Sequence, residues 1–437
     1  MFPLDKKTLE ASMHEFDIVD VTAATIRQIG ALATNLEKEA GEPIIHLEIG
    51  NPGLPAEEIG IEAEIEALRS GVANQYPNIA GIPELKVAGT RFIKAFLDTD
   101  IDPEGIIPTV GSMQGSFTLM MLLKQRIPGK DTILELYPGF PAHRHQAKLL
   151  GLNLEGFDIY HYRGKKLEAK LEEYFKTGRV TAMLYSSPNN PAWTNMTEEE
   201  LEIIGRLATK YDVIVIEDLA YMGMDFRDDF SHPFKPPFIH TVSKYTDNYI
   251  LQISASKIFS YAGQRIAIVC MSDKVFERRY ETFDKFYDMP RFGDAYIYGV
   301  LYCASSGTTH SCQYAIARMM EKAVEGKLDF VGHCREYGRR AGIMKKILSD
   351  NGFEIIYKMD GDNMIADGFF MTAGYGDMPS RELQQELLRY GVSSISLPST
   401  GSEQNGVRIT ISNISDDESF EILNNRLKKF SEDHPKA

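Results

Sequence analysis

A lysine, two hydroxyl side chains and an arginine lie within one short segment of this sequence. Lys257 follows Ser254 and Ser256, and Arg265 lies eight residues after the lysine. A lysine amine attacks carbonyl groups when it is held in place and its pKa is lowered. A guanidinium is always charged, and its fork matches a phosphate dianion. Pyridoxal 5'-phosphate (PLP) needs both groups, because it takes a lysine as an aldimine and acts as an electron sink. The segment therefore predicts a PLP site.

Short apolar segments separated by amphipathic stretches must position these groups. The stretch 197–210 begins with Thr197-Glu198-Glu199-Glu200, which matches a capping box, and its apolar residues fall on one helix face. Because this helix lies between two apolar segments, we expect parallel strands joined by a right-handed crossover. The middle of the chain is therefore predicted to be an α/β domain. Buried strands are expected at 131–136, 181–186, 213–217, 249–253 and 266–271.

The length and the C-terminal pattern predict a second, smaller lobe. A chain of 437 residues is too long for one small core. From about residue 327 the pattern changes to two amphipathic helices, at 330–351 and 379–390. These features indicate an α+β lobe with a smaller sheet. Its alternating segments are 353–358, 368–372 and 407–411.

The charge and the cysteine content argue against several classes of protein. The formal net charge is −15, whereas a nucleic-acid-binding protein normally needs a basic face. The four cysteines have neither metal-type spacing nor the density of a disulfide scaffold, so we expect a cytoplasmic protein without a metal site. The acidic first twenty residues predict no signal peptide, and the apolar runs are too short to predict a membrane span.

Two of the predicted strands end in polar residues that suit a cofactor site. Asp218 follows the strand 213–217, and the carboxyl end of a parallel strand faces the crevice where such folds bind ligands. A carboxylate there would keep a pyridine nitrogen protonated, although it could equally serve as an N-cap. The strand 181–186 runs into Ser187-Pro188-Asn189-Asn190-Pro191, an irregular turn. The alternative there is a tight surface turn.

Three further positions are candidates for binding. The turn 111–115, which contains Ser112 and precedes a helix expected at 116–124, would present backbone amides to a phosphate, although such turns are common. Phe140 follows the strand 131–136 and would stack on a flat ring or pack in the core. Arg408 lies opposite the apolar face of its strand and would bind a carboxylate or form a surface ion pair.

Taken together, these segments resemble the class I/II, fold-type I PLP-dependent aminotransferases of the aspartate aminotransferase superfamily. The resemblance extends from Gly50-Asn51-Pro52 to Arg408, and Ser-x-Ser-Lys followed by Gly-x-Arg is its strongest element. It implies a large domain, 51–326, with a mostly parallel mixed sheet flanked by helices. It also implies a smaller α+β domain formed by 1–50 and 327–437.

The resemblance also implies a role for each matching residue. Lys257 would form the aldimine and carry a proton between Cα and the cofactor. Asp218 would pair with the pyridine nitrogen, and Asn190 and Tyr221 would bond the ring oxygen. Arg408 would bind the substrate α-carboxylate, in a pocket that Gly50 and Asn190 also line. Phe140 would stack on the ring, and the phosphate would be bound by Ser112, Met113, Gln114, Ser254 and Arg265.

Tyr76 matches a family segment that reaches the phosphate of a partner subunit, so the resemblance implies a homodimer with shared active sites. Two features depart from the family pattern. Ala192-Trp193 stands where many relatives have Thr-Gly, and the aromatic-rich segment 283–310 is longer than usual. Arg291 in that segment is a candidate to bind a second substrate carboxylate, but the extra length leaves its alignment open.

The function that these features predict is transfer of the amino group of an L-amino acid to a 2-oxo acid, by ping-pong kinetics. Two alternatives remain open. The same site would support carbon–sulfur β-elimination, because the outcome after Cα deprotonation depends on the leaving group. A non-catalytic PLP-binding regulator is a third interpretation, although the acidic stretch of about fifty residues before the family pattern leaves no room for a helix-turn-helix.

Overall fold

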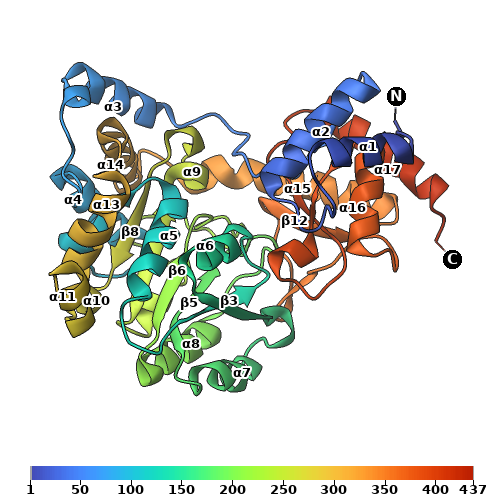
Figure 1. Cartoon of the computed structure of the whole chain (residues 1–437). Helices are drawn as coiled ribbons and strands as arrows, with labels where there is room; N and C mark the ends of the chain where they lie inside the picture. The colour runs from blue at the N-terminus through green and yellow to red at the C-terminus, as the bar shows by residue number, and fades with distance from the viewer. Residues whose placement is uncertain (1, 437) are drawn as a thin grey trace.

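The computed structural model describes residues 2–436, which fold into two lobes (Figure 1). The larger lobe is built on a seven-stranded sheet with the strand order β2-β8-β7-β6-β5-β3-β4. β8 runs antiparallel to both of its neighbours, and the other neighbouring strands are parallel. The predicted mostly parallel mixed sheet is thus confirmed. Its strands are β2 (Ile106–Thr109), β3 (Thr132–Tyr137), β4 (Asn153–Asp158), β5 (Val180–Ser186), β6 (Ile214–Asp218), β7 (Tyr249–Ser254) and β8 (Ala267–Met271).

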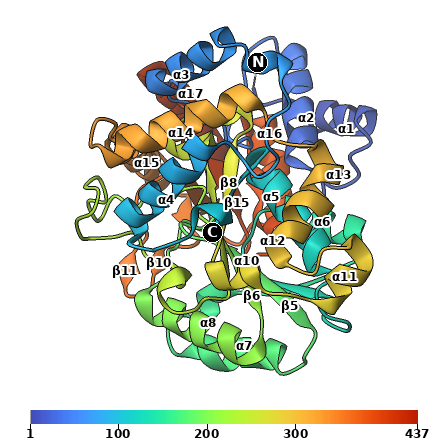
Figure 2. The same cartoon turned by 90° about the vertical axis from the view of Figure 1, so that its left-hand side faces the viewer.

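Successive residues of each central strand contribute to the two cores on opposite faces of this sheet. In β6, Val215 belongs to one buried cluster, and Ile214 and Ile216 belong to the other. The strands are therefore apolar on both sides, as in other parallel sheets. In Figure 2, α14 lies between α3 and α4 on the side of the sheet away from α5. The helices of this lobe are α3 (Glu58–Arg69), α4 (Pro83–Leu97), α5 (Gly111–Leu123), α6 (Ala142–Leu150), α7 (Lys166–Phe175), α8 (Glu198–Tyr211), α9 (Ala255–Ile258), α10 (Asp273–Glu277), α11 (Glu281–Tyr287), α12 (Phe292–Asp294), α13 (Tyr302–Ser305) and α14 (His310–Val324).

Local signals set the start of two helices that matter for the site. The Thr197 side chain accepts from the Glu200 amide, and Glu200 accepts from the Thr197 amide, so the predicted capping box starts α8. α5 begins at Gly111 instead of residue 116, because Gly111 adopts a left-handed φ of 67° that turns the chain directly from β2 into the helix. The turn expected at 111–115 is therefore the first turn of this helix.

The smaller lobe packs helices on a four-stranded antiparallel sheet of order β14-β15-β12-β9. The predicted segment 353–358 contributes only two strand residues, which pair with the end of β12. The elements are α15 (Phe330–Asp350), β9 (Glu354–Ile355), β10 (Met359–Asp360), β11 (Asn363–Met364), β12 (Phe370–Gly374), α16 (Ser380–Arg389), β13 (Val392–Ser393), β14 (Ile395–Ser396), β15 (Val407–Thr410) and α17 (Asp417–Asp433).

The N-terminal segment packs on this smaller lobe, as Figure 1 shows by the blue helices beside the red ones. Strand β1 (Ile45–His46) pairs in parallel with β13, and helices α1 (Lys6–Glu15) and α2 (Ile26–Ala40) share a buried cluster with Leu388 and Ile395. None of the helices within residues 2–436 is long and apolar enough to cross a membrane. The same residues include no group of three or more potential ligands placed to bind a metal ion.

Candidate active site

A cavity of about 800 Å³ opens at the carboxyl ends of the parallel strands. Leu136, Ser186, Asp218 and Ser254, at or near the ends of β3, β5, β6 and β7, all line it. Arg408 of β15 closes it from the smaller lobe. The cavity thus lies between the two lobes, at the position where open α/β sheets bind ligands.

Lys257 reaches this cavity from α9, the short helix that directly follows β7. The Ser254 side chain accepts from the Ser256 amide and so caps this helix at its start. Lys257 Nζ donates to the Gly50 carbonyl oxygen and lies 5.2 Å from the centre of the Phe369 ring. Within the described residues no carboxylate forms an ion pair with this amine.

The electrostatic surroundings of Lys257 favour its neutral, nucleophilic form. Burial lowers the pKa of the amine from 10.5 to about 7, and the charges of Arg265 and Arg408 act in the same direction. At neutral pH a large fraction of the amine is therefore unprotonated. A lysine in this state can attack a carbonyl group and can accept a proton from carbon.

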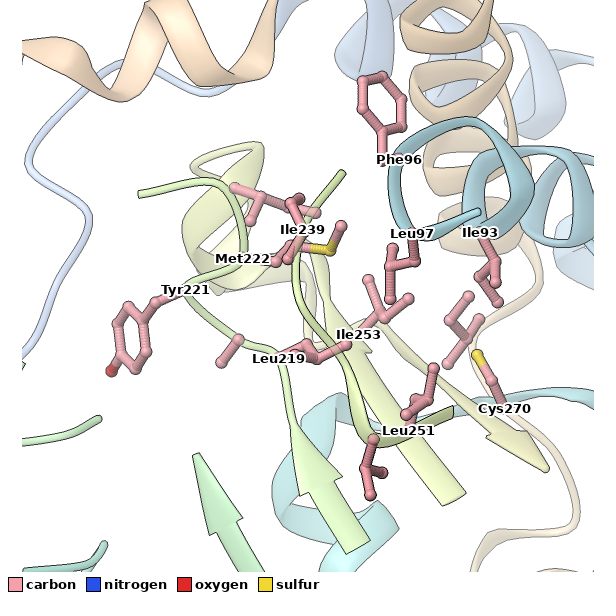
Figure 3. Close-up of a cluster of buried hydrophobic side chains, with 14 of the residues drawn as sticks. Ile93, Phe96, Leu97, Leu219, Tyr221, Met222, Ile239, Leu251, Ile253 and Cys270 are labelled. Atoms are coloured by element: carbon pink, nitrogen blue, oxygen red, sulfur yellow. The ribbon is translucent and has the colours of Figure 1, made fainter. Parts of the chain in front are cut away.

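Asp218, Tyr221 and Asn190 come together on the floor of the cavity. Asp218 is half-buried and accepts a 3.0 Å hydrogen bond from the Ala220 amide. Burial raises the pKa of Asp218, an effect that the charge of His143 opposes. The Tyr221 hydroxyl is within hydrogen-bonding reach of Asn190, and burial raises the pKa of Tyr221. In Figure 3 the Tyr221 ring stands apart from the aliphatic cluster, with its hydroxyl directed away from it.

His143 and Glu135 line the same cavity as Asp218, and sequence reasoning missed both residues. Both side chains are buried, and His143 Nδ1 lies 2.7 Å from Glu135 Oε1. The charge of His143 acts on Asp218. The available signal was Glu135 itself, the one charged residue of the buried strand β3. Phe140 lines the cavity and meets the His143 ring edge to face, at 5.6 Å between centroids.

The opposite end of the cavity is built for an anion. The Arg265 guanidinium lies over the start of α5, and its Nη1 donates to the Ala262 carbonyl at 2.9 Å. A Cβ placed on Gly111 would come within 2.4 Å of Arg265 Nη2, so glycine at this position allows the arginine to approach the helix. Ser112 and Met113, in the first turn of α5, line the cavity beside it. Helix amides and a guanidinium together suit a phosphate.

Arg408 is almost fully buried, with 1% of its surface exposed. Its guanidinium donates to the Glu48 carbonyl and to Asn190 Oδ1 at 3.4 Å, and it lies 4.8 Å over the Phe370 ring. Its Nε has no hydrogen-bond partner among the residues that the structure describes. Burial lowers the pKa of this guanidinium to about 10. A buried cation without a carboxylate partner is costly unless an anion binds to it.

The structure therefore gathers most of the residues that the sequence singled out, but not all of them. Gln114 does not line the cavity, because its side chain accepts from the Val110 amide at 2.8 Å. Tyr76 is 93% exposed and lies away from this cavity. Arg291 is engaged by Glu277 and by Glu104, the latter at 2.8 Å. Predicted residues that do line the cavity are Gly50, Ser112, Met113, Phe140, Asn190, Asp218, Tyr221, Ser254, Lys257, Arg265 and Arg408.

Comparisons with known proteins agree with this geometry. Residues 42–425 match the family described as aminotransferase class I and II, and the chain belongs to this family. An aspartate aminotransferase of Thermotoga maritima is 28% identical over 260 residues, which cover 59% of this chain and 66% of that protein. Glutamate-pyruvate aminotransferase AlaC of Escherichia coli is 28% identical over 263 residues, which cover 59% and 60%. The matched region thus spans just under two thirds of these relatives.

Solved structures show the same fold. The aspartate aminotransferase of Thermus thermophilus with maleate superimposes with a TM-score of 0.75 at 19% identity, over 93% of this chain and 96% of that one. The aspartate aminotransferase of Thermotoga maritima gives a TM-score of 0.74 at 19% identity, over 96% and 99%. At these identities the likeness concerns the fold.

The family implies PLP as cofactor, and the residues of the cavity fit it. The amine of Lys257 has no carboxylate partner within residues 2–436 and suits an aldehyde. Asp218 lines the cavity as a half-buried carboxylate and suits a protonated ring nitrogen. The cradle between Gly111 and Arg265, which a Cβ would fill, suits the phosphate.

Proposed function

We propose that this protein is a PLP-dependent aminotransferase that moves the amino group of an L-amino acid to a 2-oxo acid. One observation carries the proposal. Two cations, the half-buried Lys257 and the buried Arg408, line the same cavity, and neither forms an ion pair with a carboxylate in the described chain. An amine that is partly neutral at pH 7, beside a guanidinium that lacks an anion, suits the amino and carboxylate groups of an amino acid.

We infer that four side chains and the first turn of α5 would hold the cofactor. Arg265 and the first turn of α5 would bind the phosphate, Asp218 would pair with the ring nitrogen, and Asn190 and Tyr221 would bond the ring oxygen. Bound in this way, PLP supplies an electron sink for the pair of electrons left when a bond at Cα breaks. The burial that raises the pKa of Tyr221 keeps its hydroxyl protonated and able to donate.

The protein side of the reaction then rests on orientation and proton transfer. Arg408 would bind the α-carboxylate through its fork and so hold the Cα–H bond toward Lys257. The neutral Lys257 amine would accept the proton from Cα and then donate it to C4' of the cofactor. It would thus act first as base and then as acid. The Gly50 carbonyl, which accepts from Lys257 Nζ, would keep the amine directed into the cavity between these steps.

A half-reaction tests this function. The PLP-loaded protein is mixed with single amino acids and no acceptor, and the visible absorbance and the released products are followed. We expect a shift in absorbance and one 2-oxo acid per site at most, with no free ammonia. Continuous release of a 2-oxo acid together with ammonia would assign the protein as a β-lyase instead. An unchanged spectrum with every amino acid would refute amino-group transfer.

We also propose that the protein is a homodimer in which Tyr76 of one subunit reaches the other active site. Support comes from the exposure of Tyr76 and from its neighbours, because His310 Nδ1 lies 3.3 Å from the carbonyl of Gln75. Exposed aromatic residues of the segment 283–310 lie just before His310 in the chain. They are Phe286, Tyr298 and Tyr302.

Mixing two inactive variants tests the shared site. Tyr76→Ala and Lys257→Ala proteins are each measured alone and after subunit exchange. A mixed dimer would contain one site with Lys257 from one chain and Tyr76 from the other, so activity should return. Failure to regain activity in a preparation shown to contain mixed dimers would contradict a shared site.

We further propose the division into a large domain, 51–326, and a small domain, 1–50 with 327–437. The pairing of β1 with β13 supports it, since this contact joins the N-terminal segment to the C-terminal lobe. Limited proteolysis that cut near residue 327 before other sites would support the boundary.

A further inference from the structure

Trp193 is the only tryptophan of the chain. Its ring packs between Tyr221 of the larger lobe and Gly368 and Phe370 of the smaller lobe. It follows the turn that carries Asn190, and 1% of its surface is exposed. Its backbone adopts a left-handed φ of 64°, which is costly for a bulky residue. Its indole Nε1 has no hydrogen-bond partner within the described part of the chain. A strained backbone and an unpaired polar group persist only where the surrounding structure holds them.

The indole packs against Gly368 of the smaller lobe. A Cβ placed on Gly368 would lie 2.1 Å from Trp193 Cε2 and 2.1 Å from Nε1, so no other residue could stand there without moving the ring. The ring of the large lobe thus rests directly on the backbone of the small lobe, two residues before β12 begins. The position of β12 relative to the cavity is therefore tied to Trp193.

Trp193 also contacts two aromatic rings that face the site. Its ring meets Tyr221 at 5.5 Å and Phe370 at 6.2 Å between centroids, both nearly edge to face. Phe370 is the first residue of β12, and Arg408 lies 4.8 Å over its ring. A displacement of the indole would therefore move the surface on which Arg408 rests.

Trp193 is also linked to Asn190 through the backbone hydrogen bonds of the turn that contains both residues. The Trp193 amide donates to the Asn189 carbonyl at 3.0 Å, and the Asn189 amide donates to the Thr194 carbonyl at 2.9 Å. These bonds close the turn around Asn190, whose Oδ1 accepts from Arg408. With the indole fixed between the lobes, the amide of Asn190 is held between Arg408 and Tyr221.

We propose that Trp193 is a positioning residue that acts through Tyr221, Asn190 and Phe370. It fixes the position of Arg408, which would bind the α-carboxylate, relative to Asn190 and Tyr221, which would bond the cofactor ring oxygen. The proposal rests on the function proposed above and concerns residues that Trp193 touches, since Trp193 itself does not line the cavity. Ala192-Trp193 stands where many relatives have Thr-Gly, and this difference then helps to position the residues of the site.

Three substitutions test this role in the PLP-loaded protein: Trp193→Phe, Trp193→Gly and Gly368→Ala. Binding is measured with 2-methylalanine, which carries an α-carboxylate but no Cα hydrogen, by the change in visible absorbance. KM and kcat are measured with a reactive amino acid, and the pH midpoint of the visible spectrum is titrated. Phe175→Ala is the matched control, because Phe175 is a buried ring of the same large cluster that does not line the cavity.

We expect Trp193→Gly and Gly368→Ala to raise the Kd for 2-methylalanine and the KM by about 10- to 100-fold, since small misplacements of binding groups have effects of this size. The pH midpoint should move as well, because Tyr221 and Asn190 lose their alignment. Trp193→Phe should retain part of the wild-type affinity. Phe175→Ala should lower the melting temperature without changing Kd or the pH midpoint.

The inference is overturned if the Trp193 and Gly368 variants lose stability as the control does while Kd, KM and pH midpoint stay at wild-type values. If Trp193→Gly fails to fold, the same measurements on Trp193→Phe and Gly368→Ala decide. A wild-type protein that fails the half-reaction would refute the proposed function instead, so the two failures are distinguishable.

Discussion

Replacing Lys257 by methionine should stabilise the cofactor-free protein, because the partly desolvated amine is costly to keep protonated. In the folded protein its pKa is about 7, against 10.5 for an exposed lysine. This difference corresponds to about 5 kcal/mol at pH values below 7. Methionine is of similar length and carries no charge, although it gives up the hydrogen bond to the Gly50 carbonyl, worth about 1 kcal/mol. We therefore expect a net gain of about 3 to 4 kcal/mol near pH 7.

The sign of the pH dependence follows from the lowered pKa. Between pH 7 and 10.5 the unfolded chain binds a proton at Lys257 that the folded chain has released. Wild-type stability should therefore rise with pH across this window, and the advantage of Lys257→Met should shrink in step.

Urea unfolding of the cofactor-free proteins, followed by circular dichroism from pH 6 to 9.5, measures both effects. Lys148→Met is the control, because Lys148 is exposed on α6 and lies outside the cavity. A difference between wild type and Lys257→Met that does not change with pH would refute the claim that burial depresses the pKa of Lys257. A destabilised Lys257→Met protein would refute it as well.

Three further substitutions probe the other ends of the cavity. Asp218→Asn keeps an acceptor for the Ala220 amide, so the protein should fold while kcat falls by about 100-fold or more, as measured by steady-state kinetics. Arg408→Lys removes the fork, and kcat/KM should fall by about 10- to 100-fold; unchanged kcat/KM would exclude Arg408 as the carboxylate site. Gly111→Ala should cost about 1 to 3 kcal/mol because of its positive φ, and it should weaken PLP binding measured by equilibrium dialysis. Full PLP affinity in that variant would argue against the phosphate cradle.

The sequence predicted the groups that lie at strand ends. Asp218, Asn190 and Lys257 each follow a short apolar segment, and parallel strands bring their carboxyl ends to one edge of the sheet. Both the strand positions and this convergence follow from local pattern and from the rules of α/β folds. The start of helix α8 was also predicted from a local pattern, the capping box of Thr197 and Glu200.

The contacts that are distant in sequence could not be predicted. Lys257 donates to the carbonyl of Gly50, which is 207 residues away, and a backbone carbonyl leaves no signal in residue type. His143 and Glu135 come together because the start of α6 folds back on β3, a geometry set by the packing of that turn. The contact between Trp193 and Gly368 likewise joins residues of different lobes, so neither residue type alone predicted it.

Nitrogen tracing tests amino-group transfer most directly. The PLP-loaded protein is incubated with a ¹⁵N-labelled amino acid and an unlabelled 2-oxo acid, and the nitrogen of the newly formed amino acid is examined by mass spectrometry. Transfer through the Lys257 site predicts ¹⁵N in that new amino acid, and none in a Lys257→Ala protein. Appearance of the ¹⁵N as free ammonia, with no label in the new amino acid, would contradict the proposed function.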